Sequence, residues 1–229
     1  MNGGRMTEKR WKVLQSEAAK QLGKGEVGRA ANLLVEAIEM APREARLYEQ
    51  LVHAALGAGG IETAVKAATE LVALEPRNPH YAYLRAVAAM AAGDLDTAER
   101  VLTRALEATP TSAEIRQALA QIARRQAQPE RALELLADAV RHAPTTMSIV
   151  SDYASVLLEL HRYAQAREVL APMAGAHPAD AGLQLAMAQA CAKLGEVKTA
   201  WVHAVRAKDT DDADIRAQAV RLVAELDNR

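Results

Sequence analysis

The apolar positions of the chain have the spacing of amphipathic helices, and the whole pattern repeats every 34 residues. In the second half of each repeat an alanine is followed by apolar residues four and seven positions later, which places all three on one helical face. The alanines are Ala30, Ala64, Ala98, Ala132, Ala166 and Ala200. The residues four positions later are Leu34, Ala68, Leu102, Leu136, Leu170 and Ala204. The pattern predicts a helix in each second half, with one buried stripe.

Prolines and glycines mark the boundaries of the same period. The first five repeats end near Pro42, Pro76, Pro110, Pro144 and Pro178, and the sixth has Asp212 in that place. Mid-repeat turns are expected at Gly25, Gly59, Gly93, Ala127, His161 and Gly195, where glycine can end a helix in the left-handed region. We therefore expect an N-terminal extension over 1–10, helix–turn–helix units over 11–44, 45–78, 79–112, 113–146, 147–180 and 181–214, and a capping helix over 215–229.

Three residues depart from the repeat. Pro172 interrupts the second helix of the fifth unit, so that helix is expected to kink or end near Leu170. Trp201 takes a place that smaller residues hold in other repeats, and we expect it to pack the capping helix. Cys191 aligns with small residues and is expected to be a buried filler.

Composition supports an all-α fold. Half of the residues are hydrophobic, phenylalanine is absent, and aromatic residues make up 3% of the chain. Alanine, the best helix former, allows helices to pack closely, and the scarcity of aromatic residues disfavours a strand-rich fold.

With its five prolines and six alanines in one register, the chain resembles the tetratricopeptide repeat family over residues 11–214. Alanine or valine replaces the family's first-helix glycine, as in degenerate bacterial repeats. The resemblance implies a right-handed α-solenoid whose first helices line a concave groove for a protein or peptide partner. The groove residues carried over are Lys12, Arg46, Glu49, His53, His80, Tyr83, Val87, Met90, Gln117, Gln121, Arg124, Ser151 and Ser155, with Leu185 and Gln189 in the last unit.

Within this groove Tyr83, Val87 and Met90 form a candidate apolar anchor patch. The alternative is that Val87 and Met90 pack inward. Relatives that grip a C-terminal carboxylate use lysine and asparagine on the first helix, where this chain has Gln15 and Ala19. Recognition of that type is not expected.

The charge pattern gives little indication of nucleic-acid binding. The formal net charge is −1, and the cluster of Arg124, Arg125 and Arg131 lacks interleaved aromatic residues, so we interpret it as a solvated surface. Residues 1–25 carry six basic and two acidic residues, whereas residues 208–229 carry four basic and six acidic ones. This asymmetry leaves head-to-tail self-association open.

Several motifs resemble chemical sites but lack a feature that each site requires. Gly23 to Gly28 spell a dinucleotide fingerprint, but a helix rather than a strand is expected before it. The acids between Asp209 and Asp214 lack the glycine and distant glutamate of a calcium loop, and capping by Asp212 or Asp214 accounts for them. The histidines lack zinc-ligand spacing. No cofactor, metal or catalytic residue is predicted.

The sequence therefore favours a non-enzymatic interaction scaffold that binds a protein or peptide in its groove. The alternative is a structural or chaperone-like subunit of a bacterial secretion, envelope or pilus assembly, which would use its ends and convex face. An enzyme would require an enclosed pocket with converging titratable groups. No apolar run is long enough to span a membrane and no secretory leader is recognisable, so a cytoplasmic location without membrane insertion is expected.

Overall fold

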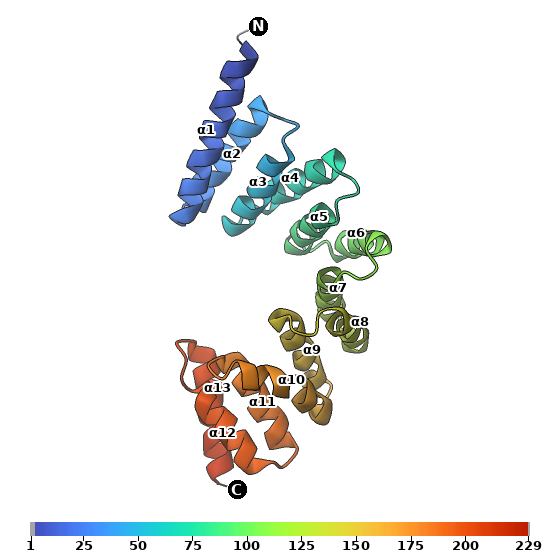
Figure 1. Cartoon of the computed structure of the whole chain (residues 1–229), viewed down its shortest axis with the longest axis vertical. Coiled ribbons are helices and arrows are strands. Elements are labelled where there is room, and N and C mark those ends of the chain that lie inside the picture. The colour runs from blue at the N-terminus through green and yellow to red at the C-terminus, as the bar shows by residue number, and fades with distance from the viewer. Residues whose placement is uncertain (1–2, 229) are drawn as a thin grey trace. The chain divides into compact units, whose positions relative to one another are not determined.

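Helices joined by short turns make up the computed structural model, which describes residues 3–228 and the side chains of residues 10–228. Within this described part there are thirteen helices and no strand, so the all-α prediction is confirmed (Figure 1). The chain divides into two compact units, residues 1–110 and 111–229.

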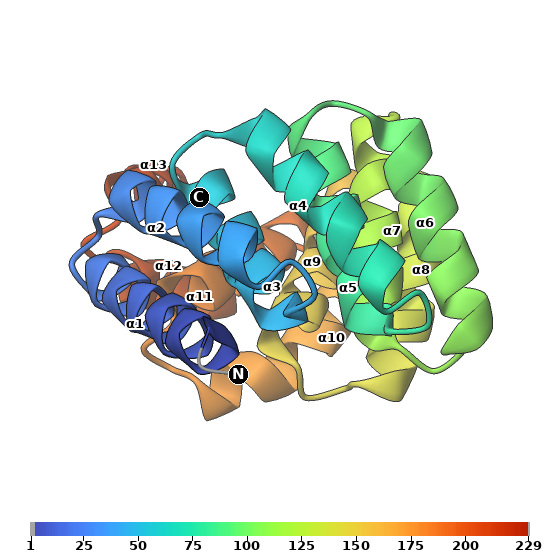
Figure 2. The same ribbon diagram turned by 90° about the horizontal axis from the view of Figure 1, so that it is seen from above.

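The first unit contains three helical hairpins. Its helices are α1 (Gly3–Gly23), α2 (Val27–Met40), α3 (Ala45–Gly57), α4 (Ile61–Leu74), α5 (Pro79–Ala91) and α6 (Leu95–Ala108). The stretch expected as an extension is thus helical from Gly3 onwards. The second helix of each hairpin packs on the first helix of the next hairpin, because α2 contacts α3 and α4 contacts α5. Figure 2 shows α1, α3 and α5 along one side of this unit and α2, α4 and α6 along the other.

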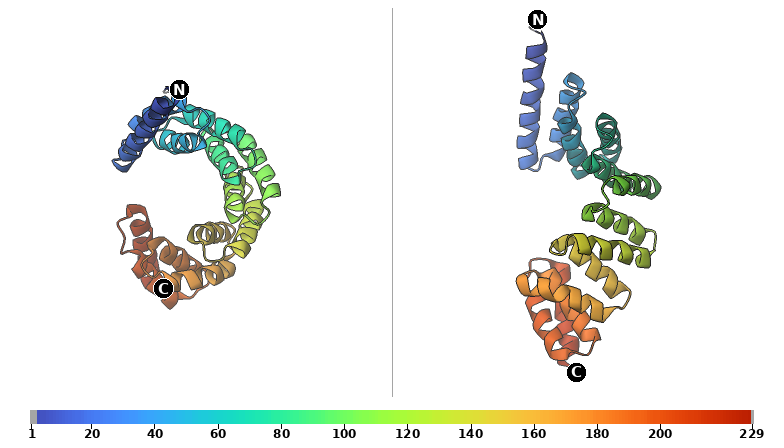
Figure 3. Two further views of the ribbon diagram at one scale, coloured as in Figure 1. Left: turned by 45° about the horizontal axis from the view of Figure 1, so that its top comes forward. Right: turned by 45° about the vertical axis from the view of Figure 1, so that its right-hand side comes forward.

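The second unit contains three further hairpins and a final single helix. Its helices are α7 (Ala113–Arg125), α8 (Pro129–His142), α9 (Met147–Glu159), α10 (Tyr163–Ala176), α11 (Ala181–Lys193), α12 (Val197–Ala207) and α13 (Ala213–Asp227). The final helix packs on both α11 and α12, as the two views of Figure 3 show at the red end of the chain.

The repeated prolines act by ending the second helices. The residue before each one has a non-helical backbone, with φ between −140° and −125° and ψ between 65° and 77° at Ala41, Glu75, Thr109, Ala143 and His177. A residue that precedes proline is sterically disfavoured from the right-handed helical region, so the helix cannot continue. After the loop, a side chain often caps the next first helix: Asn78, Ser112, Asp180 and Asp212 accept hydrogen bonds from backbone N–H groups at the starts of their helices.

Inside each hairpin the turn passes through the left-handed region. Gly25, Gly59, Gly93 and Gly195 have φ between 74° and 79° there. Ala127 and His161 take the same conformation in the fourth and fifth repeats, with φ of 56° and 58°. Because a side chain disfavours this region, these two turns carry backbone strain that the glycine turns avoid.

The buried stripe is confirmed. All six repeat alanines from Ala30 to Ala200 are 0% exposed. The residues four positions after them are also buried, as is Cys191. An alanine at these places lets neighbouring helices approach closely, which a larger side chain would prevent.

Two predictions in the second unit concern Pro172 and Trp201. The helix that was expected to kink or end near Leu170 does not end there but continues to Ala176 through Pro172. Both Pro172 and Glu168, whose carbonyl loses its helical partner, are exposed, so water can satisfy that carbonyl. Trp201 does reach α13, since its Nε1 atom donates to Oδ1 of Asp227 over 2.9 Å. Its side chain remains 41% exposed, however, and the core near the cap contains Ala207, Ala219 and Leu185 instead.

Candidate binding surface on the first helices

In the first unit, hydrogen bonds between exposed or half-buried side chains join successive first helices. Nε2 of Gln15 on α1 donates to Oε1 of Gln50 on α3 over 3.0 Å. Oε1 of Glu49 on α3 lies 3.1 Å from Nε2 of His80 on α5. These contacts hold polar side chains of three helices in a defined arrangement on one surface.

The groove residues expected in the first unit differ in exposure. Exposed side chains are Lys12, Arg46, His53 and His80, whereas Glu49, Tyr83 and Val87 are half-buried. Met90 is 8% exposed, so the alternative of inward packing holds for this residue. Tyr83 packs against the core of the first unit. The apolar patch is therefore reduced to the accessible parts of Tyr83 and Val87.

In the second unit a carboxylate organises the corresponding surface. Oδ2 of Asp152 on α9 accepts from Nε2 of Gln117 over 2.7 Å and from Nε2 of Gln121 over 3.4 Å, both on α7. One turn further along α7, Arg124 lies 3.4 Å from Glu159 at the end of α9. Ser151 is half-buried and Ser155 exposed on α9. Of the expected residues in this unit, Gln117 and Gln121 thus bond to one carboxylate, and Arg124 pairs with a second one.

Asp152 is a surface residue that the sequence analysis did not identify. The repeat register contains the relevant indication. Gln15 to Gln50 and Gln117 to Asp152 are both pairs separated by 35 residues, and the acceptors occupy the same place in their repeats. An acceptor at this place therefore bonds a glutamine of the preceding first helix in both units.

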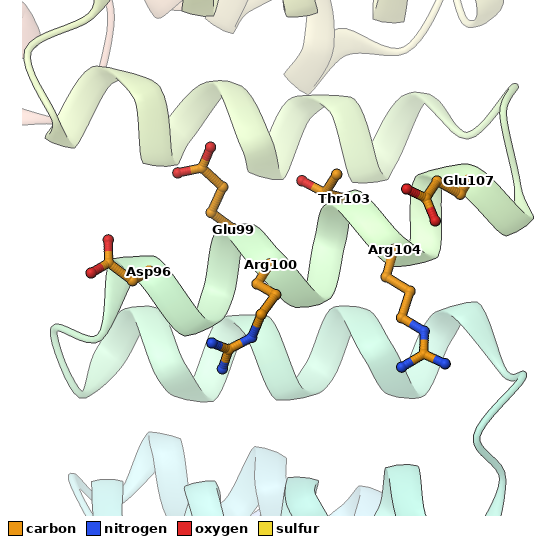
Figure 4. Close-up of a pocket in the computed structure, with 6 residues that line it drawn as sticks. All are labelled: Asp96, Glu99, Arg100, Thr103, Arg104 and Glu107. Carbon is orange, nitrogen blue, oxygen red and sulfur yellow. The ribbon is translucent and has the colours of Figure 1, made fainter.

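A hollow on the surface of α6 does not resemble an enzyme pocket. Its volume is about 540 Å³, and its lining residues are Asp96, Glu99, Arg100, Thr103, Arg104 and Glu107. All six belong to α6, and Figure 4 shows the acids and arginines interleaved along that one helix. Residues of a single helix cannot enclose a substrate, so we interpret this hollow as a charged surface.

A second hollow coincides with the expected binding residues of the second unit. It has a volume of about 330 Å³ and is lined by Gln121, Arg124 and Arg125 of α7 and Glu159 of α9. Two of these residues, Gln121 and Arg124, were carried over from the resemblance. Two of the three arginines that the sequence analysis assigned to a solvated surface, Arg124 and Arg125, thus border this hollow.

The motifs that resemble chemical sites have structural roles. Of the dinucleotide-like glycines, Gly23 ends α1, Gly25 forms the turn at φ 77°, and Gly28 lies in α2. Asp212 caps α13 by accepting from the backbone N–H groups of Asp214 and Ile215. Burial, with Glu196 nearby, raises the pKa of the Cys191 thiol to about 11, which keeps it protonated at neutral pH. Among the side chains of residues 10–228 no cluster of three metal-ligating groups occurs.

Comparison with known families is consistent with the repeat structure. A model described as tetratricopeptide repeat matches residues 49–113, and one described as anaphase-promoting complex, cyclosome, subunit 3 matches residues 91–173. The chain belongs to the tetratricopeptide repeat family. Tetratricopeptide repeats generally form non-enzymatic scaffolds that mediate protein–protein interactions.

Solved tetratricopeptide structures share the fold at low sequence identity. A structure reported in the functional characterisation of Pseudomonas aeruginosa pilF is 17% identical, with a TM-score of 0.75 over 96% of this chain and 99% of that one. The anaphase-promoting complex hetero-tetramer Cut9–Hcn1 is 14% identical, with a TM-score of 0.73 over 96% of this chain and 43% of the other. YrrB, a tetratricopeptide protein with an unusual peptide-binding site, is 17% identical, with a TM-score of 0.61 over 83% and 99% of the two chains.

Two further findings limit which functions of known proteins can be assigned to this chain. The chain spans less than half of the Cut9–Hcn1 chain that it matches. No curated protein matches it. In the described part of this tetratricopeptide chain, every helix is too short or too polar to cross a bilayer.

Proposed function

We propose that the chain is a non-enzymatic scaffold that binds a protein or peptide segment on the surface formed by its first helices. The observation that carries this proposal is the set of inter-helix hydrogen bonds, above all the one from Gln117 to Asp152. Side chains that are already held by neighbours lose little freedom when a partner binds, so more of the contact energy is available for affinity.

The same surface offers both hydrogen-bond donors and acceptors. Amide side chains such as Gln121 carry both kinds of group, and Ser155 carries a hydroxyl that can act as either. Arg46, His53 and Arg124 add exposed polar groups in the two units. A segment with free backbone N–H and C=O groups, or with mixed charges, fits this chemistry. YrrB, which has a peptide-binding site, supports this function by analogy of fold.

The test measures recovery of partners by the full chain and by surface variants. Tyr83→Ala and Arg124→Glu alter the proposed binding surface, and Tyr163→Ala and Arg100→Glu are matched controls on second helices. We expect the first two variants to lose, by about tenfold or more, a partner that the controls retain. Equal recovery by all four variants would remove the assignment to the first helices.

A second candidate is a fixed subunit of a larger assembly. The matching model for a subunit of the anaphase-promoting complex and the fold shared with Cut9–Hcn1 favour it. This candidate predicts that partners are retained by Tyr83→Ala and Arg124→Glu but lost when a charge is placed at Val35 on α2 or Val220 on α13. Both of these apolar residues are at least 40% exposed.

A further inference from the structure

A small hollow lies between α11 and α13 in the second unit. Its volume is about 70 Å³, and its lining residues are Gln189, Ala192, Lys193, Leu222, Glu225 and Leu226. The two helices pack against each other, and Figures 1 and 3 show them side by side. Unlike the hollow on α6, this one has walls from two helices that face each other.

The walls of the hollow are apolar. Ala192 is 8% exposed and Leu226 is 3% exposed, and both belong to the core cluster of this unit, against which Leu222 packs. Ligand pockets for metabolites commonly measure about 300–1,000 Å³, so this volume is too small for one. It has room for the end of one aliphatic side chain, for which these walls are chemically suited.

The rim of the hollow is charged and asymmetric. Lys193 stands on the α11 side and Glu225 on the α13 side, and both side chains are exposed. A partner segment is therefore matched best when it carries an acidic residue on one side of its aliphatic residue and a basic residue on the other. Exposed charges of this kind mainly set orientation and association rate.

The hollow is continuous with the proposed binding surface. Gln189 has the same place in its repeat as Gln121 and Ser155, two residues of that surface. Its Nε2 atom also lies 3.5 Å from Oε1 of Gln218 on α13, so α11 and α13 are linked by side chains in the manner of the other first helices. The single final helix thus takes the place of a seventh first helix and completes the hollow.

We propose that this hollow is the anchor pocket for one aliphatic side chain of a partner peptide, carried between an acidic residue that faces Lys193 and a basic residue that faces Glu225. The inference rests on the proposed function, but it places the apolar anchor at α11 and α13 of the second unit. The patch around Tyr83 would then make a smaller contribution.

The experiment uses the full chain and a displayed library of random dodecapeptides. Enriched peptides are synthesised, and their affinities are measured by titration calorimetry for the wild type and for three variants. Ala192→Leu fills the hollow, Lys193→Glu with Glu225→Lys reverses its rim, and Lys198→Glu on α12 is a control at an exposed lysine that does not line it. Circular dichroism checks that each variant is folded. The rim reversal alters exposed residues alone, so it tests the inference even where Ala192→Leu fails to fold.

We expect enriched peptides to share one aliphatic residue flanked by opposite charges. Replacing that residue by serine, or filling the hollow, should weaken binding by about tenfold or more, whereas Lys198→Glu should leave it unchanged. Peptides with exchanged flanking charges should regain affinity for the reversed rim. Peptides that bind wild type, filled and reversed proteins equally, yet lose affinity for Arg124→Glu, would overturn the anchor pocket and leave the proposed function standing. A library that yields no binder to the wild type would overturn both.

Discussion

Nδ1 of His203 on α12 lies 2.7 Å from Oε1 of Gln184 on α11. The Gln184 side chain is 0% exposed, and its Nε2 atom donates to the backbone oxygen of Ala174 on α10 over 3.0 Å. Because an amide oxygen only accepts, Nδ1 of His203 must carry the proton. One buried amide on α11 thereby bonds groups of the two neighbouring helices, and removal of a partner would leave a buried polar atom without a hydrogen bond.

This network predicts that the second unit is destabilised by mild acid. Burial lowers the pKa of His203, and the nearby Arg206 acts in the same direction. A histidine with a lowered pKa in the folded state stabilises the fold above its unfolded pKa of about 6.5, and that contribution is lost as the pH falls below this value. Urea unfolding followed by circular dichroism should therefore show lower stability at pH 5.5 than at pH 7.5.

The histidine responsible can be identified with two variants. His203→Gln should reduce the loss of stability in acid, whereas His142→Gln, at an exposed place on α8, should leave it as in the wild type. An unchanged loss in His203→Gln would show that another group is responsible.

The strained turns predict stabilisation by glycine. Ala127→Gly removes a side chain from the left-handed region and should raise the free energy of unfolding by about 0.5–1 kcal/mol, after allowance for the greater freedom of glycine in the unfolded chain. His161→Gly should gain less, because the imidazole Nδ1 also lies 2.7 Å from the hydroxyl of Tyr163. The reverse change, Gly59→Ala, should be destabilising although a Cβ atom there would meet no neighbour within 4 Å. Thermal or urea unfolding measures all three.

Replacement of Pro172 by alanine should stabilise α10. Alanine restores the N–H group that can bond the carbonyl of Glu168, and it removes the clash of the proline ring within the helix. We expect a gain of about 1–2 kcal/mol, since alanine also makes the unfolded chain more flexible. Pro178→Ala, in the loop after the same helix, is the matched control and should be neutral or destabilising. A loss of stability in Pro172→Ala would indicate that packing contacts of the proline ring stabilise the fold more than the ring strains the helix.

The cap of α13 can be tested by its chemistry. Asp212→Ala removes the acceptor for the N–H groups of Asp214 and Ile215 and should cost about 1 kcal/mol of stability. Asp212→Asn retains an acceptor oxygen and should cost less. Asp214→Ala leaves the cap in place and serves as the control. Equal losses in the alanine and asparagine variants would argue against capping by Asp212.

The fold was predictable because its boundaries depend on local backbone preferences. A residue before Pro76 is disfavoured from continuing a helix, and Gly59 adopts a positive φ at no steric cost, so proline and glycine alone place the helix ends. Ala64 and Leu71 likewise follow the helical period. The predicted end of α10 near Leu170 was wrong, because a helix can continue through an interior proline where water reaches the freed carbonyl, and exposure is a property of the tertiary structure.

The binding surface was less predictable than the fold. The repeat register places Gln117 on the first-helix surface, but its bond to Asp152 depends on how α7 and α9 pack. Met90 occupies a groove position in its repeat and yet is buried. A methionine side chain is long and flexible, so it can turn inward and pack in the core. The hollow bordered by Ala192 is formed by residues of both α11 and α13. No local pattern in either segment indicates such a hollow.

The two tryptophans of the chain fall one in each unit, Trp11 on α1 and Trp201 on α12. Trp11 packs partly against the core of the first unit, and Trp201 bonds to Asp227 near the end of the final helix. Each unit therefore contains its own fluorophore. Replacing either indole by phenylalanine would leave an emission spectrum that follows one half of the chain alone, so the order in which the halves lose structure can be observed without attaching a dye.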